Sequence, residues 1–195
     1  MSKEKNREAP AASDEALVNR QRAALPGDTR PFAELVRRHQ ERILANCRYL
    51  TGSPDDAEDL AQDVFIKAFF ALGRFEGRAR FGTWLQRIKV NHCLNHLRRR
   101  RRWREEDVDD AALQARPELK VDADAEARLA DTDRRRRIAA VLDAMPETLR
   151  VPLLLRDLDG LEYAEIAERL GIGLSAVKMR IKRGREMFRR LYDAG

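Results

Sequence analysis

Residues 53–73 read SPDDAEDLAQDVFIKAFFALG, and this stretch carries the signals of one complete helix. Ser53 suits the N-cap, Pro54 suits the first helical position, and the carboxylates that follow lie at the positive end of the helix dipole. Gly73 provides a stop. Similar start and stop signals recur along the chain, so the sequence predicts a protein built from helices.

Three further helices are expected around this one, and four helices in about ninety residues can share one core. The first covers about 14–25 and ends at Pro26-Gly27. The second follows a cap at Asp28 or Thr29 and closes at Gly52. The fourth opens at Gly82 or Thr83 and runs through the arginines of residues 98–102.

A second helical group is expected from about residue 125, with an interruption at Pro146. Helices over 148–157, 163–170 and 174–192 follow, and the last two are joined by Gly171-Ile172-Gly173. This pair has the dimensions of a helix-turn-helix. The predicted fold is therefore all-α, with two small helical domains.

Charge divides the chain into blocks, although its 39 basic and 33 acidic residues give a net charge of only +6. Residues 51–63 carry acids and no base, whereas 74–104 are strongly basic and end in RRRRRWR. The sign reverses over 105–133 and turns basic again from 174. Two basic surfaces separated by an acidic linker favour a polyanionic partner, although a solvated helix face is the ordinary alternative for any charge run.

Membrane and secreted proteins are excluded by the same sequence. The longest apolar runs, such as 151–155, fall far short of the roughly 20 residues that a membrane helix needs. The polar beginning of the chain lacks the apolar segment of a secretory signal, and two cysteines, Cys47 and Cys93, make no disulfide framework. A cytoplasmic location is expected.

The sequence contains no catalytic motif: a G-x-S-x-G elbow, a glycine-rich phosphate loop and a catalytic carboxylate pair are all missing. We therefore expect no enzyme and no cofactor. His92 and His96 lie one helical turn apart beside Cys93, but no further ligand set accompanies them. A pair on a helix surface is the preferred interpretation, and no metal site is expected.

Three segments, in order, resemble bacterial sigma factors of the extracytoplasmic-function group of the sigma-70 family. DAEDLAQDVF (56–65) resembles the signature that binds core RNA polymerase. FGTWLQRIKVN (81–91), followed by the basic run, resembles the promoter-melting helix, and the helix-turn-helix matches the second domain. The resemblance implies a sigma region 2 domain at 28–104, after an N-terminal tail and short helix (1–27), an acidic linker at 105–133 and a region 4 domain at 134–195.

In this family the acidic helix docks on a coiled coil of the largest polymerase subunit. Asp59, Gln62, Ile66 and Phe69 share one helix face, which suits a partner helix. For the aromatic residues Phe65 and Phe69, a place in the hydrophobic core is the alternative to polymerase binding. The implied polymerase-binding residues are Asp59, Gln62, Asp63, Phe65, Ile66 and Phe69.

The loop FEGRARF (75–81) would capture a base flipped from the non-template strand in the downstream promoter element. Glycines permit close backbone approach, arginines suit phosphate, and an aromatic ring can stack on a base. Asparagines one turn apart on the following helix can read base edges. The implied residues are Phe75, Arg78, Arg80, Asn91, Asn95, Arg98 and Arg99, while Trp84 is expected in the core and the arginine run on the duplex backbone.

The front of the last helix would read the upstream element in the major groove. The matching residues are Ser175, Lys178, Met179, Lys182 and Arg183. Gly173 and Met179 depart from the family, which often places Ser, Thr or Pro and then a serine there. A thioether can contact a thymine methyl but accepts no strong hydrogen bond, so a different upstream sequence is expected.

The resemblance also implies an anti-sigma partner, a role in stress response, and an acidic linker that threads toward the RNA channel. Two other classes of function remain open at this point. A free-standing helix-turn-helix regulator would bind a palindrome alone, without polymerase, and would leave the acidic motif unexplained. A nucleic-acid chaperone would bind DNA without regard to sequence.

Overall fold

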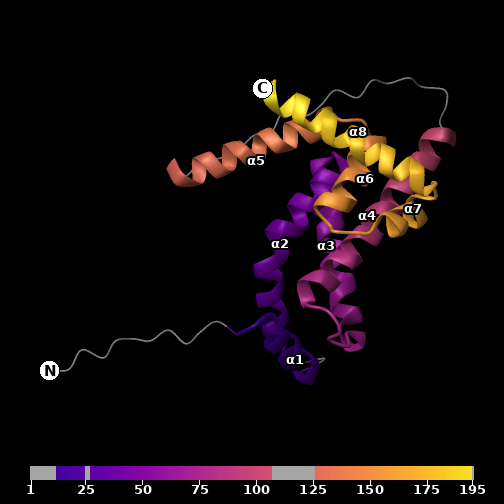
Figure 1. The fold of residues 1–195 in the computed structure, drawn as a ribbon. Coiled ribbons are helices and arrows are strands. Elements are labelled where there is room, and N and C mark those ends of the chain that lie inside the picture. Colours follow the sequence, from indigo (N-terminus) through magenta and orange to yellow (C-terminus); the bar gives the residue numbers. More distant parts are fainter. Residues whose placement is uncertain (1–11, 25–26, 107–125, 195) are drawn as a thin grey trace.

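The structure is a computed structural model that describes residues 12–24, 27–106 and 126–194. Its described residues form α-helices and one 3-10 turn, with no strand among them. Figure 1 shows α1 at one end of the molecule and α8 across the other. The all-α prediction is confirmed. The helices, in order, are α1 (Asp14–Ala24), α2 (Arg30–Thr51), α3 (Pro54–Ala71), the 3-10 turn (Leu72–Arg74), α4 (Phe81–Glu106), α5 (Glu126–Ala144), α6 (Glu147–Asp157), α7 (Tyr163–Leu170) and α8 (Leu174–Asp193).

The start of α3 follows the sequence signals closely. The Ser53 side chain accepts a hydrogen bond from the Asp56 amide at 3.3 Å, a cap of the kind that contributes about 1 kcal/mol. Gly52 ends α2 with φ +70°, the left-handed conformation that favours glycine, and its amide bonds to the Arg48 carbonyl at 2.9 Å. The chain thus passes from α2 to α3 through only two residues, Gly52 and Ser53.

Two predicted ends differ from the structure. Helix α3 ends at Ala71, close to the expected end near Leu72, but the chain passes through Gly73 as a 3-10 turn. Helix α4 starts at Phe81 rather than near Trp84, since the Arg80 carbonyl already accepts from the amides of Thr83 and Trp84. Phe81 is fully buried, and burying that ring anchors the first turn earlier than its caps suggest.

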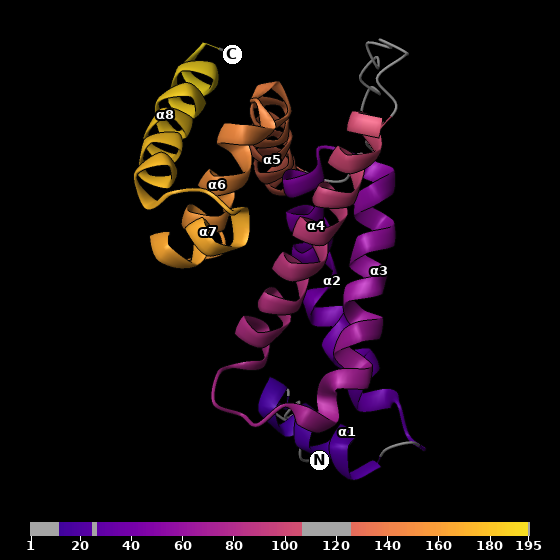
Figure 2. The same ribbon diagram turned by 90° about the vertical axis from the view of Figure 1, so that its right-hand side faces the viewer.

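The core of the first domain lies among α2, α3 and α4, which run side by side in Figure 2. Helix α1 covers one end through Leu17 and Val18, and the buried Gln21 joins it to α2. The Gln21 amide nitrogen donates to the Asp28 carbonyl and its oxygen accepts from the Phe32 amide, both at 2.9 Å. Buried core residues from the three long helices include Leu35, Ile43, Leu50, Leu60, Val64, Ala68, Leu85, Val90 and Leu97.

The second domain packs α8 across α5, α6 and α7. Gly184 permits this approach: a Cβ there would lie 3.1 Å from the Leu149 carbonyl oxygen and 3.4 Å from Leu153 Cβ. Gly171, at φ +65°, ends α7, so the predicted helix-turn-helix forms as expected. Ile166, Val177 and Ile181 fill its core.

Ion pairs and apolar residues both join the two domains. Arg48 of α2 pairs with Asp143 of α5 at 2.7 Å, and Arg100 of α4 pairs with Glu147 of α6 at 3.2 Å. The guanidinium of the buried Arg150 lies against Gly52, 2.8 Å from where a Cβ would stand. Burial lowers the pKa of Arg150 from its usual value.

Candidate functional site

A groove of about 800 Å³ lies between α2 and α3. Gln62, Phe65, Ile66 and Phe69 of the predicted polymerase-binding set line it. Phe65 is buried and Phe69 is half-buried with its ring 5.1 Å from the Phe32 ring, so both also serve the core. The core role, which was the alternative to polymerase binding for these aromatic residues, therefore applies to both.

The groove also contains apolar residues that the sequence analysis did not select. Phe70 is 81% exposed, Ile66 46% and Leu44 38%, and all three line the groove. Exposed apolar side chains gathered along one groove mark a contact surface. Leu44 lies on α2, far from the acidic signature, and only the packing of α2 against α3 places it beside Ile66.

Among the polar side chains of α3, Glu58 and Gln62 line this groove. Asp59, Gln62 and Asp63 are exposed. Asp63 points toward α4, where its carboxylate lies 2.9 Å from His92 Nε2. The α3 surface therefore offers exposed carboxylates beside an apolar groove, a combination that suits a basic amphipathic helix.

A second hollow, of about 600 Å³, lies along α4. Asn91, Asn95, Arg98 and Arg99 of the predicted downstream set line it, together with Lys67 and Arg102. The Arg98 guanidinium donates to the Asn95 amide oxygen at 3.0 Å. Amides that can read base edges thus lie among cations that can contact phosphate.

The loop before α4 is divided between exposed cations and a buried aromatic cluster. Arg78 and Arg80 are exposed, and Arg78 pairs with Glu76 at 2.6 Å. Phe75 is buried, with its ring 5.0 Å from Trp84 and 6.2 Å from Phe81. In this structure the Phe75 ring therefore packs in the core under the loop and is not exposed for stacking on a base.

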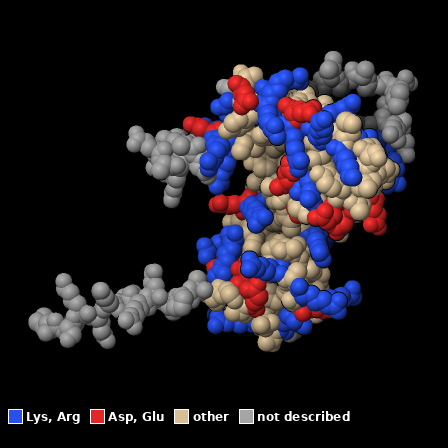
Figure 3. Space-filling model, in the orientation of Figure 1, with Lys and Arg blue, Asp and Glu red and all other residues tan. Residues whose placement is uncertain are grey.

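The arginine run does not act as one surface. Arg98, Arg99 and Arg102 line the α4 hollow, whereas Arg100 and Arg101 both reach Glu147, at 3.2 and 3.3 Å. Part of the run therefore also joins the two domains. Figure 3 shows basic groups on both domains with acidic side chains among them.

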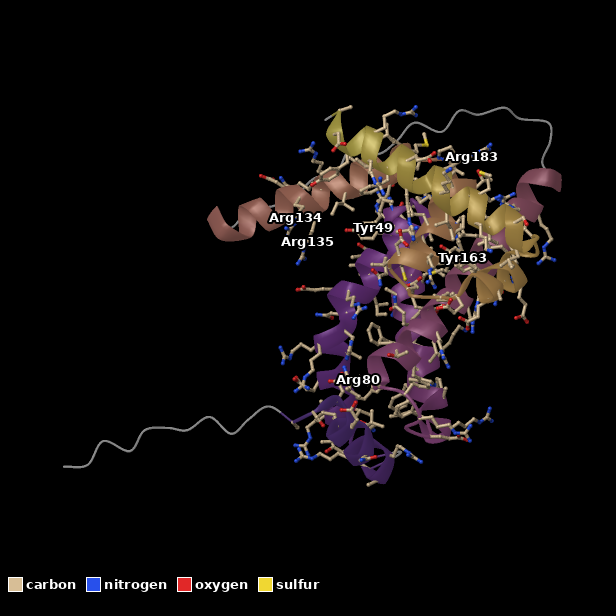
Figure 4. The ribbon with its side chains drawn as sticks, in the orientation of Figure 1. Tyr49, Arg80, Arg134, Arg135, Tyr163 and Arg183 are labelled. Carbon is tan, nitrogen blue, oxygen red and sulfur yellow. The ribbon has the colours of Figure 1, made fainter. Side chains whose placement is uncertain are left out.

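On the second domain, the predicted upstream set is open to solvent. Ser175, Lys178, Met179, Lys182 and Arg183 are all exposed, and Met179 is 49% exposed. Figure 4 labels Arg183 on α8 and Arg80 just before the start of α4, and these two residues lie well apart. A short exposed row at the front of a recognition helix suits the major groove.

The two histidines on α4 and the cysteines Cys93 of α4 and Cys47 of α2 have partners of other kinds. His92 and His96 lie beside Asp63 and Asp56, and Cys93 Sγ donates to Cys47 Sγ at 3.6 Å. That hydrogen bond and burial raise the pKa of the Cys93 thiol. Residues 12–24, 27–106 and 126–194 contain no group of three or more side chains arranged to hold a metal.

Every helix in the described part of the chain is too short or too polar to cross a lipid bilayer. Comparison with known families places two matches on the two domains. Sigma-70 region 2 matches residues 35–103, and Sigma-70 region 4 matches residues 135–188. The chain belongs to the extracytoplasmic-function group of the sigma-70 family. The matches place the groove and the α4 hollow in region 2 and the α8 surface in region 4.

Curated relatives support this assignment over most of the chain. The RNA polymerase sigma-H factor of Pseudomonas aeruginosa is 36% identical over 177 residues, which cover 89% of this chain and 90% of the relative. The ECF RNA polymerase sigma-E factor of Escherichia coli K12 is 36% identical over 181 residues, 89% and 91% of the two chains. The chain is an alternative RNA polymerase sigma factor, and a free-standing regulator is not favoured.

Solved structures agree with the fold. CnrH, in a complex with the cytosolic domain of CnrY, has a TM-score of 0.54 at 25% identity, and the match covers 94% of this chain and 99% of CnrH. The sigma factor RpoE of Bartonella quintana, in a complex with the anti-sigma factor NepR, also has a TM-score of 0.54, at 21% identity over 83% and 96% of the two chains. The second likeness shows the fold alone.

Proposed function

We propose that this sigma factor divides its work among three surfaces: the α2/α3 groove binds core RNA polymerase, α8 reads the upstream promoter element, and α4 holds the opened strand. The observation that carries the proposal is the groove, because its exposed Leu44, Ile66 and Phe70 lie beside the family's acidic signature. The domain bounds are 28–104 and 134–195, with the acidic linker 105–133 between them.

Docking on polymerase rests on a combination of apolar and acidic groups. Ile66 and Phe70 supply apolar area that a partner helix can bury, Gln62 lines the groove with them, and Asp59 is exposed on the same helix. Asp63 is also exposed on α3, where it faces α4 beside His92. The partner surface is expected to be basic at its rim and apolar at its centre, as an amphipathic helix of the largest polymerase subunit would be.

Strand opening is assigned to the α4 hollow. Arg98, Arg99 and Arg102 supply positive charge for phosphates, while Asn91 and Asn95 supply donors and acceptors for a base. Arg78 and Arg80 extend the positive surface toward the loop. Phe75 contributes by supporting that loop, since its ring is buried.

Upstream recognition is assigned to the front of α8, through Ser175, Lys178, Met179, Lys182 and Arg183. The chain acts by binding, and the polymerase performs phosphoryl transfer. Both CnrH and RpoE of Bartonella quintana are solved in complexes, the second with an anti-sigma factor, and we propose that an anti-sigma protein holds this chain too. The linker 105–133 lies largely outside the described residues, and its passage toward the RNA channel stays a prediction, as do the cytoplasmic location and a role in stress response.

Pull-down of core polymerase tests the docking surface. A variant with Asp59→Ala, Gln62→Ala and Ile66→Ser should bind core enzyme at least about tenfold more weakly, because side chains at the centre of an interface contribute most of the affinity. Glu186→Ala, an exposed acid on α8, is the matched control and should bind normally. Normal binding by a folded triple variant would contradict the assignment.

A further inference from the structure

The two cysteines of the chain meet in the core of the first domain. Cys47 lies on α2 and Cys93 on α4, and both side chains are 0% exposed. Their sulfur atoms are 3.6 Å apart, with the Cys93 thiol donating to Cys47 Sγ. Both thiols are free, and the sequence contains no further cysteine that could pair with either of them.

The distance between the two sulfur atoms is short enough for a disulfide to form by a small movement. An S–S bond measures about 2.05 Å, so the sulfurs have to approach by roughly 1.5 Å. Rotation of the two side chains supplies part of this approach, and movement of α2 toward α4 supplies the rest. The bond would join positions 46 residues apart in the sequence.

The groups beside the pair favour a reactive sulfur at Cys47. The hydrogen bond from Cys93 lowers the pKa of Cys47. The Lys89 ammonium acts in the same direction, against burial and the Asp159 carboxylate. Lys89 lies one turn before Cys93 on α4 and is itself buried, with Nζ 2.6 Å from Asp159 Oδ1. Cys47 is therefore the partner that forms the thiolate, and the thiolate is the nucleophilic form of a cysteine.

We propose that Cys47 and Cys93 are a modification site, at which hydrogen peroxide converts the thiol pair into a reversible disulfide between α2 and α4. The Cys47 sulfur attacks one peroxide oxygen: an S–O bond forms, the O–O bond breaks, and the departing hydroxide takes up the Cys47 proton as water. The Cys93 sulfur then attacks the Cys47 sulfur: the S–S bond forms, the S–O bond breaks, and a second hydroxide leaves with the Cys93 proton. Two thiols are oxidised to one disulfide while one peroxide is reduced to two water molecules.

Hydrogen peroxide suits this site because it is uncharged and little larger than water. Both sulfurs are covered by the core, and a molecule of this size can enter through the local openings that folded domains undergo. The same burial keeps a second chain or a bulky thiol away from an oxidised Cys47. Cys93 is thus the thiol in place to complete the reaction, so the bond forms within one molecule.

The bond would also change a surface assigned above to polymerase. Leu44, which lines the groove from α2, lies one turn before Cys47 on the same helix. Protein interiors are close-packed and transmit strain, so drawing α2 toward α4 moves it relative to α3, the other wall of the groove. This part of the proposal rests on the docking function proposed above: the oxidised chain binds core polymerase more weakly than the reduced chain.

Mass spectrometry of the full chain tests the disulfide. After exposure to hydrogen peroxide and alkylation in denaturant, the parent should have lost two hydrogen atoms and should carry no alkylated cysteine. A digest should contain the peptide of Cys47 joined to the peptide of Cys93, and dithiothreitol should restore both thiols. Sulfinic acid, a disulfide between two chains, or two free thiols after this treatment would overturn the site.

Cys93→Ala is the matched control, because alanine is small and apolar and leaves Cys47 without its partner; Cys47→Ala serves the same purpose from the other helix. In a pull-down of core polymerase with the peroxide removed beforehand, the oxidised parent should bind at least about threefold more weakly than the reduced parent. Dithiothreitol should restore its binding. Both alanine variants should bind equally before and after peroxide.

These measurements separate the disulfide from its effect on docking. Equal binding by the oxidised and reduced parent, with the disulfide present, would overturn the coupling to the groove and leave the modification site. A loss of binding that also occurs in the alanine variants would come from oxidation elsewhere and would overturn the coupling too. A reduced parent that does not bind polymerase would refute the docking function and the coupling together, whereas the disulfide is decided by the mass spectrum alone.

Discussion

The two helices assigned to DNA, α4 and α8, present their polar side chains in different states. On α8 the predicted reading residues, such as Lys178 and Met179, are exposed. On α4, Asn91 and Arg98 are bonded to Arg169 of the second domain. The contact between the domains thus involves polar side chains of α4, which stay exposed beside it, and leaves the front of α8 open to solvent.

The largest effect is expected from Gly184→Val, because this substitution disturbs the domain that carries α8, one of the two helices compared above. Gly184→Val places new atoms against the Leu149 carbonyl, 3.1 Å from the position of Cβ, and should destabilise the second domain by about 1 to 3 kcal/mol. Promoter-specific transcription should be lost while core polymerase still binds. Thermal unfolding and pull-down measure the two outcomes.

Gly173→Ala is the control for Gly184, since a Cβ there would meet nothing within 4 Å and the backbone φ is −64°. It should retain both stability and transcription. A Gly184→Val variant that unfolds at the parental temperature would show that α6 and α8 do not pack as closely as described.

Next in size is the loss expected on α4. Asn91→Ala with Arg80→Ala should reduce run-off transcription from duplex promoters by about tenfold or more, with a much smaller loss on templates already mismatched in the downstream element. The reason is that these side chains are assigned to holding the opened strand. Arg22→Ala, which removes an exposed charge from α1, is the control. Equal losses on both templates would refute the assignment.

A smaller and qualitatively different effect is expected on α8. Lys178→Ala and Met179→Ser should each change the preferred upstream sequence, because a base contact is worth roughly 1 to 3 kcal/mol at one position. Arg189→Ala lies farther along the helix and should weaken all sequences alike. Selection from randomised promoters measures the preferred upstream sequence of each variant. If all three variants recovered the parental consensus, α8 would contact the DNA backbone without reading bases.

The smallest effect concerns pH and the junction of α4 with α3. Burial lowers the pKa of His92 below its ordinary 6.5 against the opposing effect of Asp63, and Lys67 and Arg99 act in the same direction as burial. The unfolded chain therefore takes up this proton more readily. The stability that neutral His92 provides is complete above pH 6.5 and declines as pH falls through that value.

His92→Gln tests this directly. Chemical unfolding at about pH 7.5 and about pH 5.5 should show a smaller loss of stability on acidification for the variant than for the parent, because the histidine difference is removed. The other two histidines, His39 and His96, are common to both proteins and cancel in the comparison. A larger loss in the variant would show that Asp63 outweighs burial.

Much of the fold follows from local signals that the sequence displays. Ser53, Gly52 and Gly171 fix helix ends through caps and one backbone conformation each, and these depend on few neighbours. The start of α4 was placed too late, because Phe81 is held by burial in a cluster that no local signal reveals. Tertiary packing outweighed the caps there.

The candidate site was predictable where one helix carries it and unpredictable where two helices meet. The α3 face and the α8 front follow from helical spacing together with the family resemblance. Leu44 was missed because its neighbour Ile66 comes from another helix, and the Asp159 contact was missed because it joins residues about seventy positions apart. Phe75 was expected near DNA but is buried, since a ring beside Trp84 and Phe81 gains more from burial.

As a sigma factor, this chain should give core RNA polymerase a promoter preference. Run-off transcription from genomic fragments, with core polymerase and this chain as the only proteins and with start sites mapped, measures that preference. We expect discrete start sites that share an upstream and a downstream element and disappear when the chain is omitted. Start sites that are unchanged without the chain would contradict it, as would a chain that binds a palindrome yet yields no transcript.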